Sequence, residues 1–214
     1  MSEFKTIKNI KGGSRNYSVE CENIMKGVDR DNKPRLLLHV CCAPCSSYCL
    51  EYLLDYFDIT VFFYNPNMDT EVEYHHRANE LQRFIKEAGH DVKVIIKSYK
   101  PEEFYDEVRG LEDEPEGGAR CLKCYELRLR KAAKYAAENS FDYFTTTLSI
   151  SPHKNASALN EIGEKLGFEY KVKHLPSDFK KKDGFKRSIE LSMQYRLYRQ
   201  NYCGCVYSKE DTTA

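Results

Sequence analysis

Apolar residues follow two alternating patterns along the chain. Short continuous apolar runs predict buried strands, and longer segments in which apolar residues recur every three or four positions predict helices. The predicted strands cover residues 35–40, 59–64, 92–96, 141–147 and 168–172. The predicted helices cover residues 44–57, 71–88, 121–138, 153–166 and 185–200. This alternation is typical of an α/β domain with a parallel sheet flanked by helices, of the Rossmann-like (HUP-like) kind.

The pattern also predicts the domain organisation. We expect one α/β domain at residues 34–208, preceded by a polar leader at residues 1–33. Ligands of parallel sheets bind beyond the carboxyl ends of the strands. Three segments fall there and are the expected site: the cysteine-rich residues 41–45, the turn at 65–67 and residues 145–152.

The composition indicates where the chemistry lies. Of 214 residues, 41% are hydrophobic and 31% are charged, as in a globular protein with its own core. No apolar run approaches the roughly 20 residues of a membrane helix, and the first residues lack the apolar part of a secretory signal. We therefore expect a cytoplasmic protein with no membrane partner. In a reducing compartment, clustered cysteines act as metal ligands or redox groups more often than as structural disulfides, so the nine cysteines are the main candidates.

Two cysteine pairs are candidate metal ligands, although adjacent Cys41 and Cys42 cannot easily bind one small ion together and would contact different irons of a cluster. Cys121 and Cys124 lie three apart at the start of a predicted helix, so both sulfur atoms can reach one metal, and a helix N-terminus favours the thiolate. Cys41 and Cys42, on a strand-to-helix turn, raise the number of thiolates to four, which suits an iron–sulfur cluster. A tetrahedral zinc site takes the same ligands, and buried thiols without metal are the third interpretation.

Cys203 and Cys205 flank a single glycine. A pair so close can form a small, strained and labile disulfide ring, which suits the storage or relay of electrons. Two further metal ligands are the alternative.

Cys42 and Cys45 match the two-cysteine motif of thioredoxin-like proteins at a strand–helix junction. This motif would make the protein a thiol–disulfide oxidoreductase. That chemistry gives no role to the cysteine pairs further along the chain, so we treat it as an alternative.

The net charge of zero hides an uneven distribution. Residues 101–118 carry eight acids and one base, whereas residues 171–209 carry ten bases and three acids. The basic part could meet the phosphate backbone of RNA. An ordinary solvated surface is the alternative.

An ordered set of motifs then points to one family. The motifs are His39-Val-Cys41-Cys42-Ala-Pro-Cys45, Tyr64-Asn-Pro-Asn67 with Glu73-Tyr74 and Arg77, Arg120-Cys-Leu-Lys-Cys124-Tyr125 with Arg128-Leu-Arg-Lys-Ala-Ala133, Phe144-Thr-Thr-Thr-Leu148 with Ser151-Pro-His-Lys154, and Tyr198-Arg-Gln-Asn-Tyr-Cys203-Gly-Cys205. Together they resemble the QueH family of epoxyqueuosine reductases over about residues 36–208.

The resemblance implies the last step of queuosine synthesis, in which epoxyqueuosine at the wobble position of tRNA anticodons is reduced to queuosine with loss of water. It implies a 4Fe-4S cluster and no cobalamin. The cluster ligands that it implies are Cys41, Cys42, Cys121 and Cys124. It also implies that Cys203 and Cys205 form a redox-active pair, and that Cys45 is a candidate ligand of an additional iron.

The implied substrate predicts further contacts. An anticodon loop is recognised by stacking and by contacts with its backbone, so Lys154, Arg196 and Arg199 are candidate RNA-binding residues. Reduction of an epoxide also needs protons, for which the candidates are His39, Tyr74, His75 and His76. We therefore predict an iron–sulfur oxidoreductase that acts on tRNA, with an unidentified electron donor and no DNA partner. A thiol–disulfide oxidoreductase and a zinc-stabilised RNA-binding domain remain the alternatives.

Overall fold

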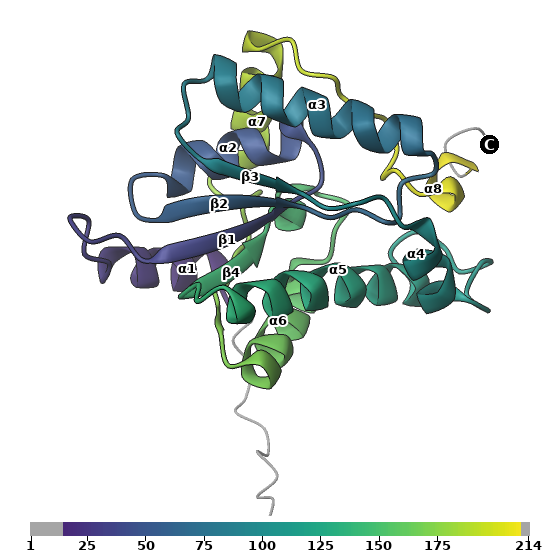
Figure 1. Ribbon diagram of the computed structural model, residues 1–214, viewed down its shortest axis with the longest axis horizontal. Helices are drawn as coiled ribbons and strands as arrows, with labels where there is room; N and C mark the ends of the chain where they lie inside the picture. The colour runs from purple at the N-terminus through teal and green to yellow at the C-terminus, as the bar shows by residue number, and fades with distance from the viewer. Residues whose placement is uncertain (1–14, 211–214) are drawn as a thin grey trace, which may run out of the picture.

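A five-stranded parallel sheet forms the centre of the computed structural model, which describes residues 15–210 (Figure 1). Its strands are β1 (Arg35–Val40), β2 (Asp58–Phe63), β3 (Lys93–Ile96), β4 (Tyr143–Thr146) and β5 (Lys173–His174). They lie in the order β3-β2-β1-β4-β5, and every neighbouring pair is parallel. The predicted Rossmann-like α/β fold is confirmed.

Helices cover both faces of the sheet (Figure 1). Helices α2 (Ala43–Leu53), α3 (Glu71–Glu87) and α7 (Gly184–Gln194) lie on one side, and α5 (Ala119–Glu138) and α6 (Ala156–Tyr170) lie on the other. Strand β1 serves both layers because successive side chains of a strand point to opposite faces. Leu36 and Leu38 pack in the core beneath α2 and α3, whereas Leu37 packs in the core beneath α5.

The strand order indicates where this sheet would bind a ligand. The chain adds β2 and β3 on one side of β1 and then returns to add β4 and β5 on the other side. Loops that follow β1 and β4 therefore diverge at the point where the direction of winding changes. This is where α/β sheets bind ligands, and the residues after β1 are Cys41 and Cys42.

Helix α1 (Tyr17–Lys26) lies within the segment that we predict as a polar leader. Asn16 caps its first turn, and Cys21 and Met25 are buried in the core shared with α2 and α3. The described part of the leader thus packs on the domain. Residues 1–14 lie outside the described residues.

Three elements differ clearly from the sequence prediction, and one of them is helix α7, which ends at Gln194 although the prediction continues to residue 200. Helix α4 (Pro101–Val108) forms inside the acidic segment, because Phe104 and Val108 lie one turn apart and are both buried. The strand predicted at residues 168–172 is wrong, because α6 continues through Gly167 to Tyr170. A Cβ at Gly167 would lie only 2.8 Å from the carbonyl oxygen of Val172, so the glycine allows the chain to return close to the helix. Helix α8 (Val206–Glu210) follows the last cysteine. Within residues 15–210, no helix is long and apolar enough to cross a membrane.

His174 on β5 links stability to pH. Burial lowers the pKa of its imidazole to about 4, whereas an unfolded histidine titrates near 6.5. The unfolded chain therefore binds the proton first, and stability falls as the pH drops from about 6.5 towards 4. We expect this residue to cost about 2 kcal/mol of unfolding free energy between pH 7 and pH 5 in urea titrations. His174→Gln should make the unfolding free energy depend less steeply on pH, because up to one proton fewer is taken up on unfolding. His153→Gln, at an exposed position, should not change this dependence.

Candidate metal centre

Three thiols gather where β1 meets α2. Cys41 follows β1, Cys42 caps the N-terminus of α2, and Cys45 lies in its first turn. Their sulfur atoms all lie within 4.8 Å of one another, and those of Cys41 and Cys42 are 3.8 Å apart. Metal–thiolate bonds are about 2.3 Å long, so this spacing suits sulfur ligands of one metal ion or of neighbouring metal ions.

The three thiols share their protons unequally. The pKa of Cys41 lies well below its usual range because its sulfur accepts hydrogen bonds from Cys42 and Cys45. The same hydrogen bonds raise the pKa values of Cys42 and Cys45. Cys41 is therefore the thiol of this group that loses its proton most readily, and the binding of a cation would favour deprotonation of the other two. A raised pKa also disfavours Cys42 as the nucleophile of a thioredoxin-like enzyme.

Cys121 and Cys124 lie in the first turns of α5. The backbone N–H of Gly117 donates to the sulfur of Cys121 at 3.2 Å, and burial raises the pKa of Cys124 to about 12. Cys41 and Cys42 pack in one buried cluster with Tyr125 of α5, and Cys121 packs against that cluster. Cys124 packs in a separate cluster with Phe104, Val108 and Cys205. Among the described residues, the thiols within 4.8 Å of one another are those of Cys41, Cys42 and Cys45, so a ligand set that includes Cys121 and Cys124 stays a prediction.

Four cations are buried around these thiols. Arg77, Arg120, Arg128 and Lys154 are each at most 7% exposed. Arg128 donates to Asn65 Oδ1 at 2.6 Å and to Cys124 Sγ at 3.9 Å. Among residues 15–210, neither Arg120 nor Arg128 has a carboxylate within ion-pair distance. Buried charges need compensation, so these cations fit a site that carries several thiolates.

Unpaired polar atoms mark the same region. Both side-chain polar atoms of Asn67, the hydroxyl of Tyr125 and the Nε atoms of Arg120 and Arg128 are buried without a hydrogen-bond partner. Asn67, Arg120 and Tyr125 line a small pocket together with Cys121 and Cys124. Buried polar groups are rarely left unpaired in folded proteins. The donor set, the buried cations and these atoms together fit an anionic, sulfur-ligated group such as an iron–sulfur cluster.

A larger cavity of about 380 Å³ lies beside the small pocket. The thiols of Cys41, Cys42 and Cys45 border it, and residues 148–154 and 199–203 form other parts of its wall. Its volume suits a small ligand or one nucleoside. Glu116, Lys154 and Cys203 border both the small pocket and the large cavity.

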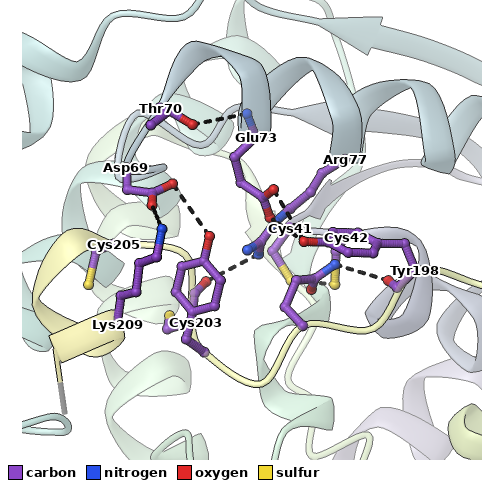
Figure 2. Close-up of polar contacts among 12 residues, drawn as sticks. Cys41, Cys42, Asp69, Thr70, Glu73, Arg77, Tyr198, Cys203, Cys205 and Lys209 are labelled. Carbon is purple, nitrogen blue, oxygen red and sulfur yellow. Dashed lines mark hydrogen bonds and ion pairs between the residues drawn. The ribbon is translucent and has the colours of Figure 1, made fainter. Parts of the chain in front are cut away.

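The Cys-Gly-Cys segment (residues 203–205) is held against the start of α3 (Figure 2). The N–H of Asp69 donates to the carbonyl oxygen of Gly204 at 2.8 Å, and Arg77 Nη1 donates to that of Cys203 at 3.4 Å. Lys209 forms an ion pair with Asp69 at 3.1 Å. Gly204 has φ of 116°, and a Cβ there would lie 2.7 Å from Met68 Sδ. Only glycine therefore fits between the two cysteines.

The predicted RNA-binding bases lie in different surroundings. Arg199 is exposed and borders the large cavity, and Arg196 is exposed three residues earlier. Lys154 is buried, pairs with Glu116 at 2.9 Å and donates to Cys203 Sγ at 3.1 Å. Its role as a phosphate contact stays a prediction, and its observed partners are a carboxylate and a thiol.

The candidate proton donors do not border the cavity. His39 Nε2 donates to the carbonyl oxygen of Tyr64, its Nδ1 accepts from Thr146, and burial lowers its pKa to about 3. Tyr74 donates to the carbonyl oxygen of Lys97 at 2.5 Å. His75 and His76 are exposed on α3. His153, which we did not predict as a donor, borders the large cavity.

The comparisons with known proteins identify the family. The sequence model of "Epoxyqueuosine reductase QueH" matches residues 36–211. This chain belongs to the QueH family. The QueH reductase of Streptococcus pyogenes serotype M1 is 47% identical over 198 residues, which are 90% of this chain and 78% of that protein. The QueH reductase of Staphylococcus epidermidis is 43% identical over 209 residues, with 94% and 88% covered.

A solved structure supports the fold of this QueH family member. The U34-tRNA thiolase NcsA from Methanococcus maripaludis, described with its [4Fe-4S] cluster, matches with a TM-score of 0.50. The match covers 89% of this chain and 67% of the thiolase at 17% sequence identity. At this identity the likeness shows a shared fold, and it agrees with the Rossmann-like sheet described above.

Proposed function

We propose that this protein reduces epoxyqueuosine in tRNA to queuosine, and its relatives carry the name epoxyqueuosine reductase QueH. The observation that carries the proposal is the large cavity, where the thiols of Cys41, Cys42 and Cys45 meet Cys203 in a setting of buried cations. A cavity of nucleoside size beside redox-capable sulfur atoms is what the reduction of a modified nucleoside requires.

We propose Cys41, Cys42, Cys121 and Cys124 as the ligands of a 4Fe-4S cluster, with Cys45 as a candidate ligand of an additional iron. When bound, the cluster would supply single electrons. Support for this ligand set comes from the packing of Cys121 against the cluster that holds Cys41 and Cys42, from the unpaired polar atoms beside Cys121 and Cys124, and from the buried arginines. The soft thiolates also fit zinc, so the metal must be identified directly.

We propose Cys203 and Cys205 as the redox-active pair. Removal of the epoxide oxygen as water consumes two electrons and two protons. Oxidation of two thiols to one disulfide releases two of each, so a reduced pair balances one turnover. Further turnovers need an external electron donor. We propose the cytoplasm, where tRNA is modified, as the location.

The test of this function uses anaerobically purified protein. We expect bound iron and acid-labile sulfide, in equal amounts for the 4Fe-4S cluster and with iron in excess where Cys45 holds an additional iron. We also expect conversion of epoxyqueuosine to queuosine in tRNA, measured by mass spectrometry of nucleosides. A colourless protein with stoichiometric zinc and no conversion would support the zinc-stabilised RNA-binding domain instead. Dithiol exchange without iron would support the thiol–disulfide oxidoreductase.

Arg196 and Arg199 supply a test of RNA binding. Both side chains are exposed, and Arg199 borders the large cavity, so we propose that they contact phosphates of the anticodon loop. Replacing both by Glu should weaken tRNA binding. It should also make the plot of log affinity against log salt less steep, by the amount that the loss of about two phosphate contacts predicts. Filter binding at several salt concentrations measures both. Arg109→Glu, at a position that is 78% exposed in the acidic segment, should leave affinity and slope unchanged. An unchanged slope in the double variant would rule out this surface.

A further inference from the structure

The two cysteines of the Cys-Gly-Cys segment lie in different environments. Cys203 is half-buried and borders both the small pocket and the large cavity. Cys205 is 8% exposed and packs with Phe104 and Val108. It borders the small pocket but not the large cavity. Burial raises the pKa of Cys205, and its thiol donates to Ser208 Oγ at 3.4 Å. One thiol of the pair therefore faces the large cavity, and the other faces apolar side chains.

Lys154 lies next to Cys203 in the lining of both the small pocket and the large cavity. Its Nζ lies 3.1 Å from Cys203 Sγ and 2.9 Å from Glu116 Oε1. Burial alone would lower the pKa of this ammonium group, but Cys203, Tyr125 and Glu116 together raise it. The lysine therefore stays charged, and Glu116 fixes the direction of its second hydrogen bond. Burial of an ammonium group without such partners would destabilise the fold, so the contacts with Cys203 and Glu116 are what keep Lys154 in this position.

The backbone around Cys203 is held from the other side. Arg77 donates to the carbonyl oxygen of Cys203, and Gly204 packs tightly on Met68. The segment thus has little freedom to turn, and the hydrogen bond from Lys154 sets the position of the Cys203 sulfur.

We propose that Lys154 is a positioning residue that holds Cys203 as the exchanging thiol of the pair, with Cys205 as the buried partner. The proposal rests on the redox role proposed above. In the forward direction, the S–H bonds of Cys203 and Cys205 break and one S–S bond forms, which releases two electrons and two protons. In the substrate, both C–O bonds of the epoxide break, a C=C bond forms, and the oxygen accepts the two electrons and the two protons and leaves as water. In the return direction, one thiolate of an external dithiol attacks Cys203, the accessible sulfur. The S–S bond breaks, and Cys205 leaves and takes a proton. The second thiolate of the dithiol then attacks the mixed disulfide, so the dithiol leaves as a disulfide and Cys203 is released as a thiolate, whose developing charge the ammonium group of Lys154 stabilises.

The test compares alkylation of the two thiols in the anaerobically prepared, reduced protein. Limited treatment with iodoacetamide is followed by peptide mass spectrometry, which gives the rate at each cysteine. We expect Cys203 to react at least about tenfold faster than Cys205, and Lys154→Met to slow Cys203 by about tenfold, the effect of one lost charge-assisted hydrogen bond. Cys205 should keep its slow rate.

Two variants complete the design. Lys154→Arg keeps the charge and should restore most of the rate at Cys203. Lys165→Met removes a lysine that is 66% exposed and paired with Glu126, and should behave as the wild type. Thermal unfolding shows whether each variant is folded. Faster labelling of Cys205, or an unchanged rate at Cys203 in folded Lys154→Met, would overturn the proposal. Because this readout needs no tRNA, failure of epoxyqueuosine reduction with the expected labelling would reject the proposed function alone.

Discussion

Cys41→Ser is expected to abolish both the cluster and the reduction of epoxyqueuosine. The sulfur of Cys41 lies within 4.8 Å of those of Cys42 and Cys45, and hydrogen bonds from both lower the pKa of its thiol. Serine has almost the same shape but offers a hard, protonated oxygen, which binds iron poorly in this setting. Iron, acid-labile sulfide and visible absorbance measure the cluster, and nucleoside mass spectrometry measures the activity.

Cys21→Ala is the matched control. Cys21 is also a buried free cysteine, but it packs against Met25 in helix α1, outside both thiol groups. This variant should keep its cluster and activity and lose only the roughly 1 kcal/mol of stability expected for a small core cavity. If Cys41→Ser retained a full complement of iron and sulfide, Cys41 would be no ligand, even if the proposed reaction were correct.

Arg128→Met should have the second largest effect, and it should act on the cluster more than on the fold. Arg128 is 1% exposed and interacts with Asn65 and Cys124. In the metal-free protein its charge is poorly compensated, so methionine, of similar length, should change the unfolding free energy by no more than about 1–2 kcal/mol. With four thiolates in place, the lost cation should speed loss of the cluster to a chelator by about tenfold or more.

Arg130→Met provides the comparison on the same helix. Arg130 is 36% exposed and pairs with Glu126 and Glu169 at the surface of α5. Its replacement should leave cluster loss at the wild-type rate, because surface ion pairs contribute little and lie in solvent. Bleaching of the visible absorbance by a chelator follows the cluster, and urea titration of metal-free protein follows the fold. Equal rates in the two variants would show that Arg128 does not stabilise the centre.

The sheet could be predicted well because its strands are short, apolar and separated by periodic helices. The range of β1 agrees with the prediction at both ends, and β2 differs by one residue. The prediction of a fifth strand at residues 168–172 was wrong because we expected Gly167 to end the preceding helix. In the structure this glycine lies inside α6 and allows close packing against Val172. Helix α4 was hidden by its acidic surface, since only Phe104 and Val108 carry its apolar side.

The site was predictable at its thiols and much less at its charges. Cysteines are rare and clustered, so their spacing alone indicated a metal centre. Arginines are common at surfaces, and sequence does not show which are buried. A usable signal was present in Arg128, which follows Cys124 by four residues and therefore lies on the same side of α5. Glu116 offered no such signal, because its contact with Lys154 depends on two loops that only the fold brings together.

The Cys-Gly-Cys segment also sets an order of assembly. Cys203 belongs to the wall of both the small pocket and the large cavity, yet it is synthesised after Cys41, Cys42, Cys121 and Cys124. Domains fold as their parts emerge from the ribosome, so the sheet and α5 can form while this wall is still missing. During that interval we expect the four proposed ligand thiols to be accessible to a cluster donor. Docking of the segment on Asp69 and Arg77 then completes the wall, so we expect a cluster to be inserted before this segment docks.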